Sequence, residues 1–460
     1  MIAGISFKSS PTKAQKIVIG QWLGCARFIW NAKCDEDTYL SQFARRYLPI
    51  GTYPPINQTF SQYKSEELSP WLSDCPSQIL RNSAVNWHKT YQNFLKGRCN
   101  KPRRKKKSDR ASIYLTRELF QFETCADGNI RLFIGSKRNN IGYLAIKFHG
   151  PFQKPNSLTI SRKNGKYRFS FCYDDGINSD GLCSAQEHLD HLKTLEKEDL
   201  EKFTIGIDRG VVRPVQAGSK VFDFSKEQKR KKQGKEKYIK RMQKRLSKQK
   251  KHSQRRKRTK EKLSKSYEKI ANIRKDFCHK TSRAIVDDEN VKVIILESLK
   301  TSNMTKKPKA KIDEKTGRWQ KNNRRAKASL NRSILDKGWH QLEAFLKYKS
   351  YWAGKALFKV PAFYTSQECA DCGHTHPNNR KSQELFVCDC CGYSGNADHN
   401  AAEVIKKRAI NLILDSGTEL SESGELLGKG RGAERKTRGA IANRAHGKEA
   451  SKKKERALVA

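Results

Sequence analysis

The sequence predicts a multidomain α+β protein, and three observations support this fold class. A chain of 460 residues is long enough for about three domains. Blocks of apolar residues at helical spacing alternate with short β-prone runs, in both halves of the chain. Two Cys-x-x-Cys pairs in the last quarter add a small segment that a metal ion, and not a hydrophobic core, would hold together.

The N-terminal part is expected to combine helices with a sheet. IAGISF (2–7) predicts a strand, and apolar residues at helical spacing predict helices over 13–31 and from Pro76 onward. We expect these helices to pack as one unit. Short β-prone runs over 112–173 predict a β-barrel-like module. Four aromatic residues occur at helical spacing, which favours a place in the core over stacking on bases: Trp22, Trp30, Trp87 and Tyr91.

The second half begins with a pattern typical of an RNase H-like domain. An apolar strand ends in Asp208, and two more short strands follow, which predicts a three-stranded meander. Residues 226–262 then hold 20 Lys and Arg against three Glu, while apolar residues persist at helical spacing. This pattern predicts a hairpin of two long basic helices. A further apolar strand, VKVIILESL, ends in Glu297.

The remaining segments surround the cysteine pairs. Residues 329–354 predict one helix, and ALFKVP (356–361) predicts a strand. A helix begins near Asp398 and is expected to end at about Leu414. Residues 415–460 are polar, Gly-rich and basic, and we expect them to be disordered.

The charge balance restricts the partners. The chain has 95 Lys and Arg against 47 Asp and Glu, a formal charge of +48, which calls for a polyanion. Nucleic acid is the usual polyanion, and a membrane surface is the competitor. No stretch has the length of a transmembrane helix, and the N-terminus lacks a long apolar region, so the sequence favours a cytoplasmic protein. In that compartment, thirteen cysteines favour metal ligation and buried thiols over disulfides.

The two cysteine pairs fit a zinc ribbon. Each Cys-x-x-Cys turn offers two thiolates to one tetrahedral ion, and four thiolates leave no open position for catalysis. We therefore predict structural zinc. Cys390 is a fifth cysteine inside the second pair and could compete with its neighbours, but the spacing favours these four ligands: Cys369, Cys372, Cys388 and Cys391.

Three carboxylates form the second candidate site. Asp208 and Glu297 end apolar strands and Asp398 begins a helix, positions where an unpaired carboxylate is costly. Singly, each is best explained as a strand-end cap or a salt-bridge partner. Together they offer the hard oxygen ligands that Mg²⁺ or Mn²⁺ prefers. Two such ions can activate water and stabilise the leaving oxygen in phosphodiester hydrolysis.

The order of these motifs resembles one known family. GIDRG, ILESL and the cysteine pairs followed by NADHNAA are similar to the three split RuvC motifs, with an inserted zinc ribbon, of TnpB-type transposon-encoded proteins of the OrfB family. GCARFIWN and the segment from 329 through the first cysteine pair are also similar to TnpB segments. The resemblance covers about Ile5 to Ile413, nearly everything except the tail.

The resemblance implies an RNA-guided DNA endonuclease related to type V CRISPR effectors. Such proteins bind a guide RNA derived from the transposon end, recognise a short adjacent motif on double-stranded DNA, and cut with one metal-dependent RuvC site. The matching motifs imply that Asp208, Glu297 and Asp398 are catalytic, and that Arg380 contacts phosphate. The implied protein is prokaryotic, nucleoid-associated, and a monomer with one RNA.

The resemblance also implies a domain order. It places a wedge β-barrel module at 1–10 and 112–178, a helical recognition domain at 11–111, a linker at 179–200, a RuvC-like nuclease domain at 201–365 and 393–414, the zinc ribbon at 366–392 and a disordered basic tail at 415–460. Three other readings remain open: a DNA transposase, a nuclease-inactive RNA-guided repressor, and a plain zinc-ribbon nucleic-acid-binding protein. All three carboxylates are present, which disfavours the repressor and the plain binding protein.

Overall fold

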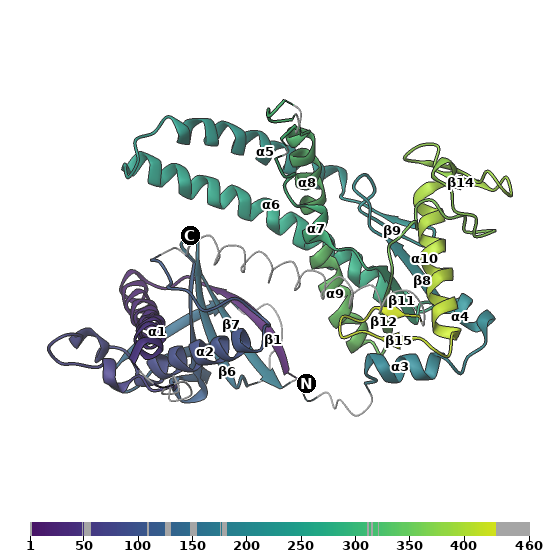
Figure 1. Ribbon diagram of the computed structural model, residues 1–460. Coiled ribbons are helices and arrows are strands. Elements are labelled where there is room, and N and C mark those ends of the chain that lie inside the picture. The colour runs from purple at the N-terminus through teal and green to yellow at the C-terminus, as the bar shows by residue number, and fades with distance from the viewer. Residues whose placement is uncertain are drawn as a thin grey trace. The chain divides into compact units, whose positions relative to one another are not determined.

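The chain divides into two compact units, residues 1–179 and 180–460, and each is described by itself. The computed structural model (Figure 1) describes residues 2–47, 49, 57–107, 110–124, 130–147, 154–174, 176, 182–310, 312–313, 316–320 and 322–428. No helix among these residues combines the length and the apolar character that a membrane-crossing segment needs.

The first unit contains a seven-stranded antiparallel sheet with the strand order β2-β6-β7-β1-β5-β4-β3. Its strands are β1 (Ile2–Ser9), β2 (Ala111–Thr116), β3 (Phe120–Thr124), β4 (Ile130–Gly135), β5 (Asn140–Lys147), β6 (Ser157–Lys163) and β7 (Lys166–Asp174). The edge strands β2 and β3 are joined only by the 3-10 turn Arg117–Leu119. In a flat sheet these edges would lie about 29 Å apart, too far for three residues, so the sheet curls round on itself.

Two long helices share one core with this sheet. They are α1 (Lys13–Tyr47) and α2 (Ser77–Leu95), with 3-10 turns at Ser61–Tyr63 and Pro70–Leu72 between them. Ile19 and Leu80 from the helices and Phe171 from β7 belong to the same buried cluster. The two helices thus pack together as expected, and they share their core with the sheet. The expectation that the tryptophans are core residues is confirmed, because all three are buried: Trp22, Trp30 and Trp87.

The second unit is built on a five-stranded sheet with the order β10-β9-β8-β11-β12. Its strands are β8 (Thr204–Asp208), β9 (Val215–Ala217), β10 (Lys220–Phe222), β11 (Val293–Glu297) and β12 (Ala356–Val360). The predicted meander is confirmed, because β8, β9 and β10 pair antiparallel in sequence order. The strands β8, β11 and β12 run parallel, so their carboxyl ends meet at one edge.

Helices cover both faces of this sheet. Val293 and Ile295 face a core formed with α3 (Ala185–Leu192), α4 (Lys197–Phe203) and α10 (Ala397–Leu414). Ile294 and Leu296 face a core formed with α6 (Gln254–Val286) and α9 (Trp339–Trp352). The alternation of side chains along a strand explains why one apolar run serves both cores. The segment 179–200, expected to be a linker with some helix, does contain helices, but α3 and α4 are packed parts of the second unit.

The basic helical hairpin is confirmed. It consists of α5 (Lys226–Ser247) and α6 (Gln254–Val286), held together by an apolar seam that includes Met242 and Leu263. The second helix continues well beyond the basic run, because its C-terminal half, with Phe277 and Ile285, packs on the sheet.

The single helix expected at 329–354 is wrong. After α7 (Thr301–Met304), the chain forms α8 (Arg324–Lys337) and α9 (Trp339–Trp352). The break is Gly338, which has φ of 75°; a Cβ there would lie 2.8 Å from the Arg274 side chain. Glycine is needed because it adopts positive φ without a steric penalty and leaves room for the neighbouring helix.

The start of the tail is folded, which corrects the predicted disorder for 415–428. Residues Glu419–Leu420 (β15) and Leu426–Leu427 (β16) form a small antiparallel pair, and Leu426 is fully buried in the core beside α10. The segment is polar on average, so its composition did not reveal the one buried leucine that holds it to the core. The rest of the predicted tail, 429–460, lies outside the described residues.

The cysteine segment adds a 3-10 turn (Pro377–Asn379) and the antiparallel pair β13 (Leu385–Val387) and β14 (Ser394–Asn396). The pairing extends this small piece to Asn396, immediately before α10 begins.

Candidate active site

The sheet edge brings two carboxylates to equivalent positions. Asp208 is the last residue of β8 and Glu297 the last of β11. The two strands are neighbours in parallel register, with Leu296 beside Ile207, so the residues that follow these two also lie side by side. Glu297 is buried and Asp208 is partly buried.

The third carboxylate comes from a helix that lies directly on β8. Asp398 is the second residue of α10 and is 3 % exposed. A Cβ on Gly206 would lie only 2.1 Å from the carbonyl oxygen of Ala402, so the absence of a side chain in β8 permits this close approach. The side chain of Asn396 caps α10 by accepting hydrogen bonds from the Asp398 and His399 amides, at 3.1 and 3.2 Å.

The electrostatics show that the three carboxylates interact. Burial, followed by the negative charges of Glu297 and Asp398, raises the pKa of Asp208 to about 7, against the opposing charge of Arg380. Burial also raises the pKa of Glu297, although a hydrogen bond from Thr365 opposes that shift. The negative charges of Glu297 and Asp398 thus raise the proton affinity of Asp208, and a site of this kind would gain from a bound cation.

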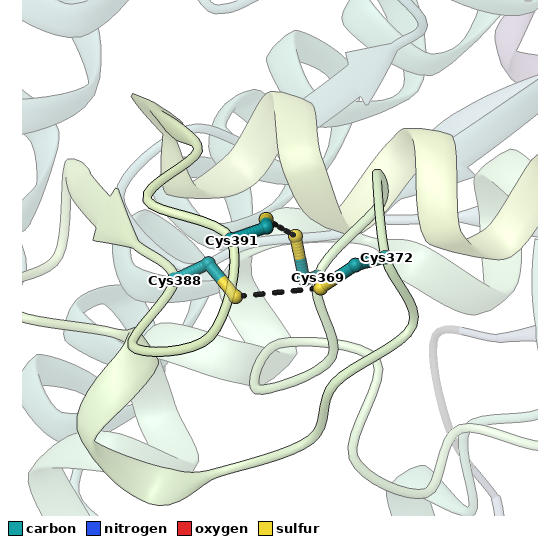
Figure 2. A group of neighbouring side chains, drawn as sticks. All are labelled: Cys369, Cys372, Cys388 and Cys391. Atoms are coloured by element: carbon teal, nitrogen blue, oxygen red, sulfur yellow. Dashed lines mark hydrogen bonds between the residues drawn. The ribbon is translucent and has the colours of Figure 1, made fainter.

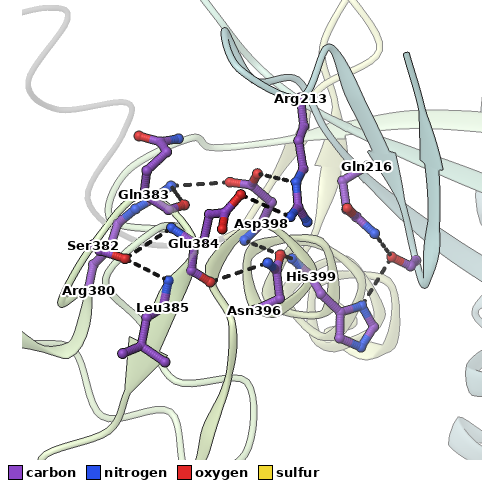
Figure 3. Close-up of polar contacts among 11 residues, drawn as sticks. Arg213, Gln216, Arg380, Ser382, Gln383, Glu384, Leu385, Asn396, Asp398 and His399 are labelled. Atoms are coloured by element: carbon purple, nitrogen blue, oxygen red, sulfur yellow. Dashed lines mark hydrogen bonds and ion pairs between the residues drawn. The ribbon is translucent and has the colours of Figure 1, made fainter.

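Two arginines compensate part of this charge (Figure 3). Arg380 donates to Oδ1 of Asp398 at 3.1 Å, and Arg213 places its Nε 3.9 Å from Oδ2 of the same carboxylate. Arg213 also pairs with Glu384 at 3.3 Å. The structure therefore places Arg380 against the third carboxylate, where the resemblance had suggested a phosphate contact, and adds Arg213 beside it.

A buried network behind the site was missed from the sequence. Arg209 is 4 % exposed and donates to the backbone oxygen of Glu297 and to Glu343 on α9, the latter at 2.9 Å. Lys359 on β12 reaches the other oxygen of Glu343 at 3.0 Å. Thr365 donates to Oε1 of Glu297 at 2.5 Å. Of these residues, only Arg209 could have been identified from the sequence. It directly follows an aspartate at the end of a buried strand, and a charge at such a position needs a buried partner.

The four predicted cysteines lie together (Figure 2). The Sγ atoms of Cys369 and Cys391 are 3.7 Å apart, those of Cys372 and Cys388 are 3.6 Å apart, and all four lie within 4.8 Å of one another. Among the described residues, no other group of three or more His, Cys, Asp or Glu places its ligand atoms this close. The exposed Cys390 does not belong to the group.

Both cysteine turns have the same local structure. Gly373 and Gly392 follow the pairs with φ of 76° and 72°, and their amides donate to the carbonyl oxygens of Cys369 and Cys388. Backbone amides of the second turn lower the pKa of Cys388 to about 6, which favours the thiolate that a metal ion requires. The cluster is therefore suited to hold a metal ion such as zinc.

The cysteine segment is fastened to the helix that carries Asp398. The side chain of Asn400 accepts from the Ala370 amide at 2.9 Å and donates to the Glu368 carbonyl at 2.8 Å. Lys407, two turns further along α10, donates to the Ala370 carbonyl at 2.5 Å. A folded cysteine segment thus helps to fix the helix start that positions the third carboxylate.

Basic surfaces occur in both units. In the first unit, a cleft of about 740 Å³ between α1, α2 and the sheet is lined by Trp30, Asn82, Asn86 and many cationic side chains. The cationic residues of this cleft are Arg27, Lys105, Lys106, Arg110, Arg162, Lys163 and Arg168. In the second unit, the hairpin carries most of its basic side chains exposed, including Arg255, Lys257 and Arg258.

Three family models match the chain. They are described as "Probable transposase" over 186–308, "Cas12f1-like, TNB domain" over 339–405 and "Helix-turn-helix domain" over 1–33. The last description differs from the geometry, because residues 2–33 form β1 and the first part of α1.

Similar proteins come from bacteria. The chain is 29 % identical to the Putative RNA-guided DNA endonuclease InsQ of Escherichia coli K12, over 94 % of this chain and 96 % of that protein. It is 32 % identical to the CRISPR-associated endodeoxyribonuclease Cas12f1 of Sulfoacidibacillus thermotolerans, over 32 % of this chain and 30 % of that one.

A solved structure supports the fold. The Cas12f1 chain of a Cas12f1–sgRNA–target DNA complex matches with a TM-score of 0.51 at 14 % identity, covering 85 % of this chain and 82 % of that chain. The mixed α+β fold agrees with that structure, and the family models and relatives show similarity to transposon-encoded proteins and to Cas12f1. The match to InsQ, which spans nearly the whole of both chains, and the transposase family model support a TnpB-type protein.

Proposed function

We propose that this protein is an RNA-guided DNA endonuclease of a transposon, which cuts double-stranded target DNA beside a short adjacent motif. The observation that carries the proposal is the electrostatic interaction of Asp208, at the end of β8, with Glu297, at the end of β11, and with Asp398, at the start of α10. Two relatives are named "Putative RNA-guided DNA endonuclease", and the match to one of them, InsQ, spans nearly the whole chain. The presence of all three carboxylates favours an active enzyme over a nuclease-inactive repressor.

The second unit is proposed to be an RNase H-like, RuvC-type nuclease domain. Its antiparallel meander continues into parallel strands, with helices on both faces, as such a domain requires. The ribbon is then an insertion directly before the third catalytic residue. In the first unit, the curled sheet would be the wedge module, and α1 and α2 the helical recognition part.

Asp208, Glu297 and Asp398 are proposed to hold Mg²⁺ or Mn²⁺. The donor set fits, since hard cations prefer carboxylate oxygens and the repulsion that raises the pKa of Asp208 would be relieved by a cation. When bound, such ions supply activation of water and charge stabilisation at the leaving oxygen. Arg213 and Arg380 would bring positive charge to the scissile phosphate, and Thr365 orients Glu297.

The four cysteines are proposed to bind one structural Zn²⁺. A site of four thiolates is closed and cannot bind substrate, so its role is to hold the segment folded. Because Asn400 and Lys407 tie that segment to α10, loss of zinc would also disturb the placement of Asp398.

Guide RNA and target DNA are the proposed partners, with one RNA per protein monomer. The exposed arginines and lysines of the hairpin and the basic cleft would contact phosphates without reading bases. Base pairing with the guide would carry the sequence information, which leaves the protein to read the shape of the duplex and a short motif.

The test is to change only the guide segment of the RNA that copurifies with the protein. Cleavage should move to the new matching site beside the same short motif. Cleavage that stayed at the old site, or that required no RNA, would reject the proposal and favour a transposase. The substitutions Asp208→Ala, Glu297→Ala and Asp398→Ala should each abolish Mg²⁺-dependent cutting while RNA and target binding persist. A variant that cut at the wild-type rate would remove its residue from the site.

A further inference from the structure

The loop between β12 and the first cysteine pair carries two exposed aromatic side chains. Phe363 is 75 % exposed and Tyr364 is 65 % exposed. Single exposed apolar residues are common on protein surfaces and need no explanation. Phe363 and Tyr364 differ from such residues in two respects: they lie near the carboxylates, and the backbone of Tyr364 is strained.

The rings lie next to the carboxylate edge of the sheet. Val360, the last residue of β12, pairs in register with Glu297, so the loop leaves the sheet at the edge where β8 and β11 end. Thr365 directly follows Tyr364 and donates to Oε1 of Glu297 at 2.5 Å. The aromatic pair is therefore one residue away from a group that touches a proposed metal ligand.

The loop holds Tyr364 in a backbone conformation that costs energy. Its φ of 60° lies in the left-handed region, which residues other than glycine and asparagine rarely adopt. The carbonyl of Tyr364 accepts from the amides of Gln367 and Glu368, at 2.8 and 3.0 Å. Arg408 of α10 secures the loop by donating to the carbonyls of Pro361 and Phe363, at 2.7 and 2.9 Å. A bulky ring kept exposed at a strained position of a well-held loop points to a function for the ring.

We propose that Phe363 and Tyr364 form a stacking platform for an unpaired base of the DNA strand that enters the carboxylate site. The proposal rests on the proposed endonuclease function. Every base offers a π-face, so an aromatic platform binds single strands without sequence preference, as a guided nuclease requires. With Arg213 and Arg380 across the site at Asp398, the platform would hold the base while the arginines hold the adjacent phosphate. Both rings are substrate-positioning groups.

Because the backbone of Tyr364 is strained, substitutions there can separate the role of the ring from an effect on stability. Tyr364→Gly removes the ring and also relieves the unfavourable φ, so it should not lower the melting temperature. Tyr364→Phe keeps the ring and should behave as wild type. Phe363→Ala removes the second ring. Trp352→Ala is the matched control: Trp352 is 50 % exposed at the end of α9, just before β12 begins, and so lies at the opposite edge of the sheet.

The assay uses the full protein with its guide RNA and a matching target DNA. Tyr364→Gly and Phe363→Ala should each lower kcat/KM for cleavage by about 5- to 150-fold, the range expected for loss of one base–aromatic stack. Duplex recognition beside the adjacent motif, measured by gel shift, should change less. In an Asp208→Ala background, 2-aminopurine at successive positions of the cut strand should be quenched at one position, and Tyr364→Gly should restore its fluorescence.

Wild-type cleavage by Tyr364→Gly together with unchanged 2-aminopurine fluorescence would overturn the platform. An equal loss of activity in Trp352→Ala would also overturn it, because the effect would then be general. If the wild-type complex does not cut DNA at all, the proposed function fails separately. The platform is then judged on a 2-aminopurine single strand of about eight nucleotides. Quenching that depends on the Tyr364 ring would support it, and quenching that is absent or independent of the ring would refute it.

Discussion

Asp208→Asn should stabilise the metal-free protein, and the stabilisation should grow with pH. The substitution keeps the shape of the side chain but removes its charge from a site that already contains Glu297 and Asp398. Because burial and these two carboxylates raise the pKa of Asp208 to about 7, the ionised form is unfavourable in the folded state. A substitution that disables the proposed nuclease would therefore make the protein more stable, as expected where function requires strain.

The pKa values of Asp208 in the unfolded and folded states determine how its contribution to stability changes with pH. In the unfolded chain Asp208 ionises near 3.8, whereas in the folded protein it stays protonated until about pH 7. The contribution of Asp208 to wild-type stability is therefore highest below about pH 4, falls as the pH rises to about 7, and is level above that. The difference of about 3 pKa units corresponds to at most about 4 kcal/mol at pH 8 and about 2 kcal/mol at pH 5. Since the side chain is partly exposed, solvent screening should leave roughly half of each value.

The assay is thermal unfolding at pH 5 and pH 8 in metal-depleted buffer, with one equivalent of Zn²⁺ retained for the cysteines. At about 2–4 °C per kcal/mol for units of 150–250 residues, Asp208→Asn should raise Tm by about 4–8 °C at pH 8 and by about half that at pH 5. Added Mg²⁺ should stabilise the wild type more than the variant, because it relieves the same repulsion.

Asp288→Asn is the control with the opposite sign. A hydrogen bond and the charge of Lys220 lower the pKa of Asp288, so its ionised form stabilises the fold above the unfolded pKa and loses that effect in acid. This variant should be less stable than wild type at pH 8. If Asp208→Asn also lowered Tm at pH 8, or raised it equally at both pH values, the three carboxylates would not repel one another and the reasoning would be wrong.

Three further predictions concern the rest of the chain. Cys369→Ser should lose about one equivalent of zinc and much of its solubility, while Cys390→Ser should keep both. If metal analysis found equal zinc loss in the two variants, the second cysteine pair would be wrongly assigned. Neutralising Arg255, Lys257 and Arg258 should reduce the salt slope of RNA binding by about 0.7–0.9 per lost phosphate contact; an unchanged slope would show that these side chains only face solvent. Arg256 is left intact because it donates to the Leu246 and Gln249 carbonyls at the turn. Gly206→Ala should destabilise by about 1–3 kcal/mol through its clash with Ala402, whereas Gly234→Ala, with open space around it, should stabilise by about 0.5–1 kcal/mol; similar denaturation midpoints for the two variants would contradict this packing.

Local signals in the sequence were enough for most of the elements. The meander after Thr204, the basic hairpin, the strand ending in Glu297 and the helix from Asp398 to Leu414 all follow from periodicity and turn residues, and the structure has each of them. The spacing of the cysteine pairs likewise identified four thiols that lie together. These features are local because a strand, a helix or a Cys-x-x-Cys turn is determined by residues close in sequence.

Only the tertiary structure decided which elements share a core. The helices α1 and α2 pack on the sheet of the first unit, α3 and α4 pack in the core of the second unit, and the start of the tail is anchored by Leu426. Each of these outcomes depends on apolar contacts between residues far apart in the chain, and composition averaged over a segment does not reveal a single buried leucine.

The surroundings of the carboxylates were also beyond the reach of sequence patterns. The sequence named Asp208, Glu297 and Asp398, but the raised pKa of Asp208 depends on how deeply the sheet edge is buried and on which charges face it. Arg209 finds its partner on α9, and Thr365 finds Glu297 across the sheet edge. Such pairings carry no periodicity, because burial and electrostatic interaction arise between elements only after the chain has folded.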